Sequence, residues 1–221
     1  HGDAARSGGV PVPWRPLLAT CGDATASPGN RRHDAAHMMK HDALSLPSAP
    51  MLTHFTRASA DGAAVDNLTT ILREGVVRGA KRMVRGGRAA VCMFDAALTE
   101  LGGLLKRDNR RRYEPFGIAL DKRYAFKAGA RPVIYIPWPE AEQMLDAEEL
   151  WRVVPIDFDR TPPIDWTFER EWRHLGDLTF PARRSVALVE TWRDADEIYD
   201  RFDGSPPCLG VLPLNDLFGR A

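Results

Sequence analysis

From residue 51 onward, the sequence is built of short apolar runs, each bounded by Gly, Pro or charged residues. Such runs are typical of β-strands. We expect strands at residues 52–57, 91–94, 116–120, 133–136, 166–173, 185–190 and 209–214. Helices are expected only at 65–74, 139–151 and 194–202, and they do not alternate regularly with the strands. This pattern predicts a mixed α+β fold rather than a doubly wound α/β fold.

The chain is expected to contain one main domain, residues 51–221. Residues 1–50 are rich in Ala, Gly, Pro, Ser and His and lack sustained periodicity, which is typical of a flexible extension or a cloning remnant. Within this segment His33, His37 and His41 have helical i, i+4, i+8 spacing. A short segment without packed surroundings cannot hold metal ligands in place, so we expect no metal site.

Charge and cysteine content restrict the setting of the protein. Lys+Arg and Asp+Glu each number 30, so no global field favours a nucleic-acid or membrane partner. Locally, residues 81–112 are net positive and residues 140–177 are net negative. The three cysteines are far apart, which fits neither a disulfide framework nor a zinc site. Because no apolar run reaches the length of a membrane span, we expect a cytoplasmic protein without a membrane partner.

Residues 166–173 are the segment whose pattern most strongly indicates a catalytic site. Read as a strand, its alternation places aromatic side chains on one face and Glu169, Glu171 and Arg173 on the other. The two carboxylates would be separated by two strand rises, roughly 7 Å, and would raise each other's pKa. A carboxylate held in this way is suited to electrostatic catalysis. The alternative is a solvated sheet face on which Arg173 balances the acids.

A second polar pair lies on the first expected strand, where alternation puts His54 and Thr56 on one face and Phe55 on the other. A histidine among apolar neighbours is more often a hydrogen-bonded core residue than a functional one. The Thr56 hydroxyl on the same face and the carboxylates later in the chain could form a functional site together with His54. Both readings of His54 therefore stay open.

These motifs, in this order, resemble DarT-like and AbiGi-like bacterial ADP-ribosyltransferases of toxin–antitoxin or phage-defence systems. The segments that carry the resemblance are 53–56, 68–75, 91–94, 112–118, 132–135 and 169–173. The resemblance implies a split, mostly antiparallel sheet that binds NAD as a substrate. It also implies that His54 bonds the ribose hydroxyls, that Glu171 binds the nicotinamide-ribose 2'-hydroxyl, and that Glu169 corresponds to the acid that engages the acceptor in arginine-directed relatives.

Other contacts to NAD are expected from residues near these motifs. Thr56 shares the His54 face, and an aromatic ring should stack on nicotinamide. The candidates for this ring are Phe94, Tyr113 and Phe116, of which Tyr113 is the least expected in the core. The candidates for the pyrophosphate are Arg57, Arg85, Arg88 and Arg112. No Gly-x-Gly-x-x-Gly fingerprint follows a strand, which argues against a Rossmann site.

The basic cluster formed by Arg107, Arg110, Arg111 and Arg112 makes DNA or RNA a credible acceptor of ADP-ribose, with Arg110 and Arg111 as phosphate contacts. A solvated loop, or one paired with the acidic region of the same domain, is an equal alternative. Two further functions stay open. One is NAD glycohydrolysis, in which water replaces the acceptor, and the other is a non-catalytic antitoxin-like binding module. A cognate antitoxin is a further expected partner.

Overall fold

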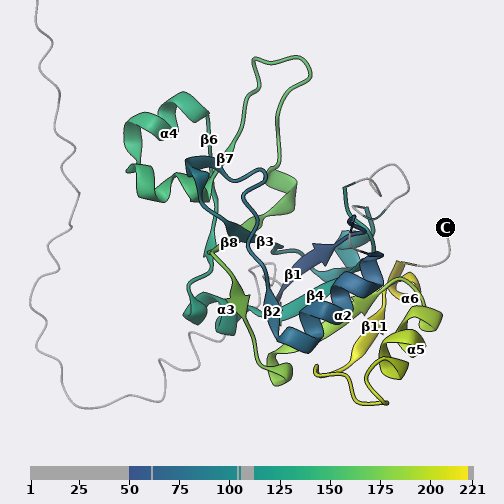
Figure 1. Ribbon diagram of the computed structural model, residues 1–221. Coiled ribbons are helices and arrows are strands. Elements are labelled where there is room, and N and C mark those ends of the chain that lie inside the picture. The colour runs from purple at the N-terminus through teal and green to yellow at the C-terminus, as the bar shows by residue number, and fades with distance from the viewer. Residues whose placement is uncertain (1–49, 61, 104, 106–111, 219–221) are drawn as a thin grey trace, which may run out of the picture. The chain divides into compact units, whose positions relative to one another are not determined.

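A computed structural model describes residues 50–60, 62–103, 105 and 112–218, all within the compact unit Ser45–Ala221 (Figure 1). Its centre is a seven-stranded sheet with the order β11-β10-β4-β1-β3-β8-β5. The strands are β1 (Met51–Thr56), β3 (Ala90–Phe94), β4 (Phe116–Asp121), β5 (Arg131–Pro132), β8 (Glu171–Leu175), β10 (Ser185–Val189) and β11 (Val211–Pro213). All neighbours pair antiparallel except β10 and β11, which pair in parallel. The predicted α+β class and mostly antiparallel sheet are confirmed.

The central strand β1 pairs very differently with its two neighbours. Along β4 it is paired over its whole length, from Met51–Asp121 to Thr56–Phe116. This close approach requires Gly117, because a Cβ there would lie 2.2 Å from the His54 carbonyl oxygen. With β3, by contrast, β1 shares the single registered pair Thr53–Phe94. The sheet is therefore divided into two halves, β11-β10-β4-β1 and β3-β8-β5, that are joined at this pair.

One face of the sheet, which we call the helix face, is covered by α2 (Ala64–Glu74). Leu68 and Leu72, on one side of α2, pack against Leu52, Met93 and Ile118 of the sheet. The helix ends where Gly75 adopts a left-handed conformation (φ 63°), as the sequence predicts. A second helix, α5 (Trp192–Asp200), adds Ala195 and Ile198 to the same core. It is capped by Thr191, whose hydroxyl accepts from the Asp194 N–H.

Smaller elements complete the unit. The helices are α3 (Lys122–Ala128), α4 (Trp138–Met144) and α6 (Asn215–Phe218). The 3-10 turns are η1 (Arg85–Gly87), η2 (Leu98–Gly103), η4 (Ala147–Arg152), η5 (Thr167–Glu169) and η6 (Ala182–Arg184). Two short sheets pair β2 (Val76–Val77) with β9 (Leu178–Thr179), and β6 (Ile134–Ile136) with β7 (Val153–Pro155).

Two predicted elements are wrong in their extent. The helix expected over 139–151 is divided into α4 and η4, because Leu145 has an extended conformation (φ −118°, ψ 144°). The strand expected over 166–173 begins only at Glu171. Before it, the Asp165 carboxylate accepts from the N–H and hydroxyl of Thr167 and stabilises a turn, and Arg170 adopts a left-handed conformation (φ 44°) that no strand continues.

Candidate active site

The first two residues of one face of β8 form a buried ion pair. The Nε of Arg173 lies 2.8 Å from Oε1 of Glu171, and its Nη2 lies 3.2 Å from Oε2. The two side chains are only 4% and 8% exposed. The remaining Nη1 donates to the carbonyl oxygens of Trp151 (2.7 Å) and Val153 (3.2 Å). Arg173 therefore holds the Glu171 carboxylate in one position, and the solvated sheet face considered from the sequence is not what forms.

Cys92 on β3 is registered opposite Arg173 and lies against this pair. Burial, followed by the charge of Glu171, raises the pKa of the Cys92 thiol well above its usual range. The thiol is therefore neutral at physiological pH and is a poor nucleophile. Its contribution is to fill the space beside the ion pair.

Glu169 approaches the same place from η5 rather than from the strand. The Tyr113 hydroxyl donates to Oε1 of Glu169, and Glu169 as a whole residue is 9% exposed. Burial, and after it the charge of Glu171, raises the pKa of Glu169, although the Tyr113 bond lowers it. Repulsion between the two acids, which the sequence predicts, is thus the smaller of the two raising causes. Glu169, Glu171 and Arg173 together carry a net charge of one negative unit when Glu169 is ionised and zero when it is protonated.

Aromatic side chains surround the carboxylates. The rings of Phe94 and Tyr113 meet edge to face with centroids 5.2 Å apart, and Phe55 lies 5.7 Å from Phe94. Phe94 is registered opposite Glu171. The Tyr135 hydroxyl accepts from the Glu171 N–H at 2.8 Å, and burial raises the pKa of Tyr135 to about 12. Apolar rings therefore limit the access of water to the carboxylates, which strengthens electrostatic interactions there.

His54 and Glu171 lie on opposite faces of the sheet. Directly paired residues share a face and side chains alternate along a strand, so Thr53, Phe94 and Glu171 form one face. His54 and Thr56 therefore belong to the helix face. His54 Nδ1 nevertheless lies 2.8 Å from the Cys92 carbonyl oxygen and so connects β1 with β3 where they separate. Burial lowers the pKa of His54, which makes the neutral ring dominant at pH 7.

The other expected NAD contacts are distributed unevenly. The Arg112 guanidinium lies 3.8 Å from the centroid of the Trp166 ring. Its positive charge acts on Glu169 and tends to lower the pKa of that carboxyl. Arg57 is exposed just after β1, and Arg85 stacks on Trp138 with 5.0 Å between guanidinium and centroid. Arg88 is exposed in the turn before β3. Phe116, paired with Thr56, lies on the helix face, away from Glu171.

Arg107, Arg110 and Arg111 fall outside the described residues, as do His33, His37 and His41. Within 50–60, 62–103, 105 and 112–218, no group of three or more His, Cys, Asp or Glu side chains could hold a metal ion. In the same ranges, no helix has both the length and the apolar character that a membrane span requires. The two described cysteines, Cys92 and Cys208, are free thiols.

Three residues of the site are not assigned by sequence reasoning: Arg173 as the buried partner of Glu171, Cys92 beside them, and Tyr135 at the Glu171 amide. The alternation of Glu171 and Arg173 on one face is a usable signal for the first. Tyr135 and Cys92 come from strands far away in the sequence, and nothing local in their segments points to Glu171.

Comparisons of the chain with models of protein families, with curated proteins and with solved structures found no match. What points to a function is therefore the geometry of this site and the resemblance of the motifs.

Proposed function

We propose that this protein is an ADP-ribosyltransferase that cleaves the nicotinamide–ribose bond of NAD and transfers ADP-ribose to a macromolecular acceptor. The observation that carries the proposal is the pair of buried carboxylates at the start of β8, Glu171 fixed by Arg173 and Glu169 held by Tyr113. Loss of nicotinamide, which leaves with the electron pair of its C–N bond, creates an oxocarbenium-like ribose. Fixed carboxylates stabilise such a cation.

The charges of Glu169, Glu171 and Arg173 suggest a separate role for each of the two acids. Arg173 compensates Glu171, so among these three side chains a net negative charge remains only when Glu169 is ionised. Glu169 would then supply this charge, which Arg112 nearby offsets in part, and as a base it would take the proton of the acceptor hydroxyl or amine when that group attacks the ribose C1'. A carboxylate with a raised pKa is suited to this task. Tyr113 bonds Glu169 and Phe94 is registered opposite Glu171, so these two rings are the surface on which nicotinamide would stack.

The separation of β1 from β3 also supports the proposal. A split sheet is what the resemblance implies, and His54 lies at the point where the two halves join. The imidazole and the Glu171 carboxylate project from opposite faces of the sheet, so contact of one NAD molecule with both would require β1 and β3 to move apart. His54 would bind ribose through Nε2, since Nδ1 is engaged with Cys92. In this role His54 orients the substrate and transfers no proton.

The principal test compares NAD cleavage by wild type and Glu171→Gln. The amide keeps the shape and loses the charge, so we expect a fall in turnover on the order of 100-fold. Glu142→Gln, on the exposed side of α4, is the matched control and should be unchanged. Circular dichroism checks that each variant is folded. Wild-type turnover in a folded Glu171→Gln protein would remove Glu171 from the mechanism.

Incubation with labelled NAD and separate pools of DNA, RNA and protein identifies the acceptor class. We expect transfer of label to nucleic acid, because the basic 107–112 cluster precedes Tyr113 in the sequence. Free ADP-ribose alone would indicate a glycohydrolase. The absence of turnover would favour a non-catalytic binding module, and one observation favours this second candidate: both oxygens of Glu171 already accept from Arg173.

A further inference from the structure

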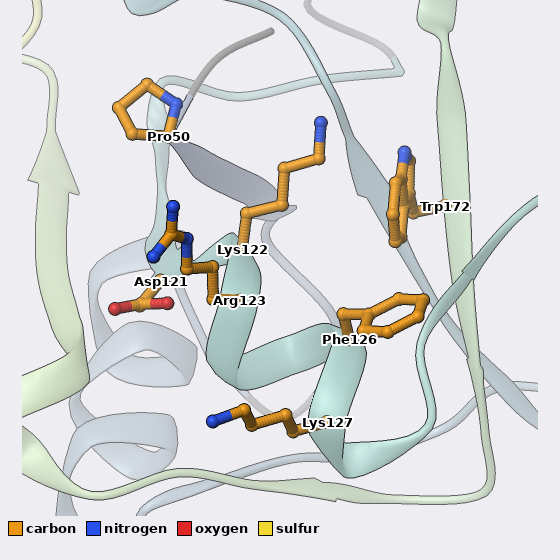
Figure 2. A pocket seen from close by; sticks show the side chains of 7 residues that line it. All are labelled: Pro50, Asp121, Lys122, Arg123, Phe126, Lys127 and Trp172. Atoms are coloured by element: carbon orange, nitrogen blue, oxygen red, sulfur yellow. The ribbon is translucent and has the colours of Figure 1, made fainter. Parts of the chain in front are cut away.

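A pocket with a volume of about 860 Å³ opens on the helix face, where β1 begins and β4 ends. It is lined by Pro50, Asp121, Lys122, Arg123, Phe126, Lys127 and Trp172 (Figure 2). Its size is in the range of roughly 300–1,000 Å³ that small-molecule sites occupy. Trp172 and Glu171 are consecutive residues of β8 and project from opposite faces. The pocket is therefore separate from the carboxylates of the proposed active site.

The charges of the pocket leave two cations uncompensated. Lys122 Nζ lies 2.5 Å from Asp95 Oδ2, and Asp121 is paired with Arg184 at 2.7 Å. Arg123 and Lys127 are exposed, and neither forms an ion pair with any residue that the structure describes. They are four residues apart on α3, where like charges repel and destabilise a helix. An anion bound between them would relieve this repulsion.

The pocket also presents aromatic surface beside these cations. The Phe126 and Trp172 rings meet at 72° with centroids 6.4 Å apart, and Lys122 Nζ lies 5.0 Å from the centre of the indole. Figure 2 shows Trp172 beside the Lys122 side chain, with Phe126 on the same side of α3 as Trp172. The Trp172 N–H is satisfied by Asp95 Oδ2 at 3.1 Å, which holds the indole in place. Phe126 is 49% exposed, and the Arg131 guanidinium lies 4.2 Å from the centroid of its ring, so only part of the ring surface is open to a ligand.

We infer that this pocket binds a nucleoside phosphate, with the phosphate between Arg123 and Lys127 and the base against Phe126 and Trp172. A flat base stacks on aromatic rings, and a phosphate accepts charge-assisted hydrogen bonds from Arg and Lys. A free mononucleotide and a nucleotide at the end of a strand share this chemistry. The site goes beyond the proposed function, because binding here needs neither Glu171 nor the cleavage of NAD.

The test is calorimetric titration of the full chain with AMP, adenosine, inorganic phosphate and a short single-stranded oligonucleotide. We expect AMP to bind more tightly than either adenosine or phosphate, because it uses both halves of the pocket. The double variant Arg123→Glu/Lys127→Glu should weaken AMP binding by about tenfold or more. Phe126→Ala, at a half-exposed position, should weaken AMP binding while it leaves phosphate binding unchanged.

Arg183→Glu/Arg193→Glu is the matched control, because it changes the net charge equally at two exposed positions outside the pocket. It should bind AMP as wild type does. Displacement of AMP by the oligonucleotide would assign the nucleotide of a strand, and its failure would assign the free nucleotide. The inference is overturned if AMP does not bind, if adenosine binds equally well, or if the control loses as much affinity. Glu171→Gln should leave AMP binding intact, so this test and that of the proposed function fail independently.

Discussion

Replacement of Arg173 by Met removes the only cation that contacts the buried Glu171 carboxylate among the described residues. Methionine keeps most of the volume of the side chain, so the change is chiefly one of charge and hydrogen bonding. Four hydrogen bonds are lost, two to Glu171 and two to the carbonyl oxygens of Trp151 and Val153. We expect Arg173→Met to be strongly destabilising.

The magnitude follows from burial. Breaking a buried ion pair by removing one partner costs about 3–5 kcal/mol, since the other charge is left without compensation. For a domain of this size, about 1 kcal/mol lowers the melting temperature by roughly 2–4 °C. The variant should therefore melt about 6–20 °C below wild type. Urea denaturation followed by circular dichroism measures the same loss as a lower midpoint at constant slope.

Two comparisons make the prediction sharp. Arg78, whose side chain is 67% exposed, also bonds two carboxylates, those of Glu74 and Asp177. Solvent screens these pairs, so Arg78→Met should cost no more than about 1 kcal/mol. The double variant Glu171→Gln/Arg173→Met removes both charges and should recover much of the loss. A single Arg173→Met variant as stable as Arg78→Met would refute the argument from burial.

Four further outcomes are expected. NAD cleavage should rise with pH through the raised pKa of Glu169, and Glu169→Gln should flatten this pH–rate profile. The contribution of Glu169 to stability changes in the opposite direction. Its pKa is higher in the folded than in the unfolded state, so the free energy of unfolding, measured by urea titration at several pH values, should fall as the pH rises through the same interval. His54→Ala removes one hydrogen bond to Cys92 and should cost about 1 kcal/mol of stability but a larger factor in NAD affinity, which parallel melting and titration would separate. Arg110→Glu/Arg111→Glu should abolish labelling of nucleic acid and spare slow NAD hydrolysis, since phosphate contacts position the acceptor; unchanged labelling would exclude the cluster.

Local signals in the sequence are enough to predict many of the elements. The apolar stripe of Val65, Leu68 and Leu72, with Gly75 after it, predicts α2 and its end, because helical spacing and a left-handed cap depend only on nearby residues. Alternation likewise predicts that Glu171 and Arg173 share a face opposite Trp172. These predictions succeed because each element buries one side against the same core.

Other features were decided by side-chain hydrogen bonds that strand periodicity does not reveal, one of them local and one between segments far apart in the chain. Strand periodicity alone extends β8 back to residue 166, whereas the Asp165 side chain and the left-handed Arg170 turn the backbone there. Glu169 reaches the carboxylate site only through this turn, where it meets Tyr113, 56 residues earlier in the chain. No pattern within either segment encodes that meeting.

The positions of His54 and Glu171 show most clearly what the sequence determines and what only tertiary pairing decides. The sequence by itself determines that each lies on a strand, and which of its neighbours share its face. It does not determine which face of one strand corresponds to which face of another, because a shift of one residue in register exchanges the two. The pairs Thr53–Phe94 and Phe94–Glu171 make that choice, and they put the histidine and the carboxylate on opposite sides of the sheet. Register is a property of tertiary pairing, in which the burial of the whole core, and not the preference of any single strand, selects the alignment.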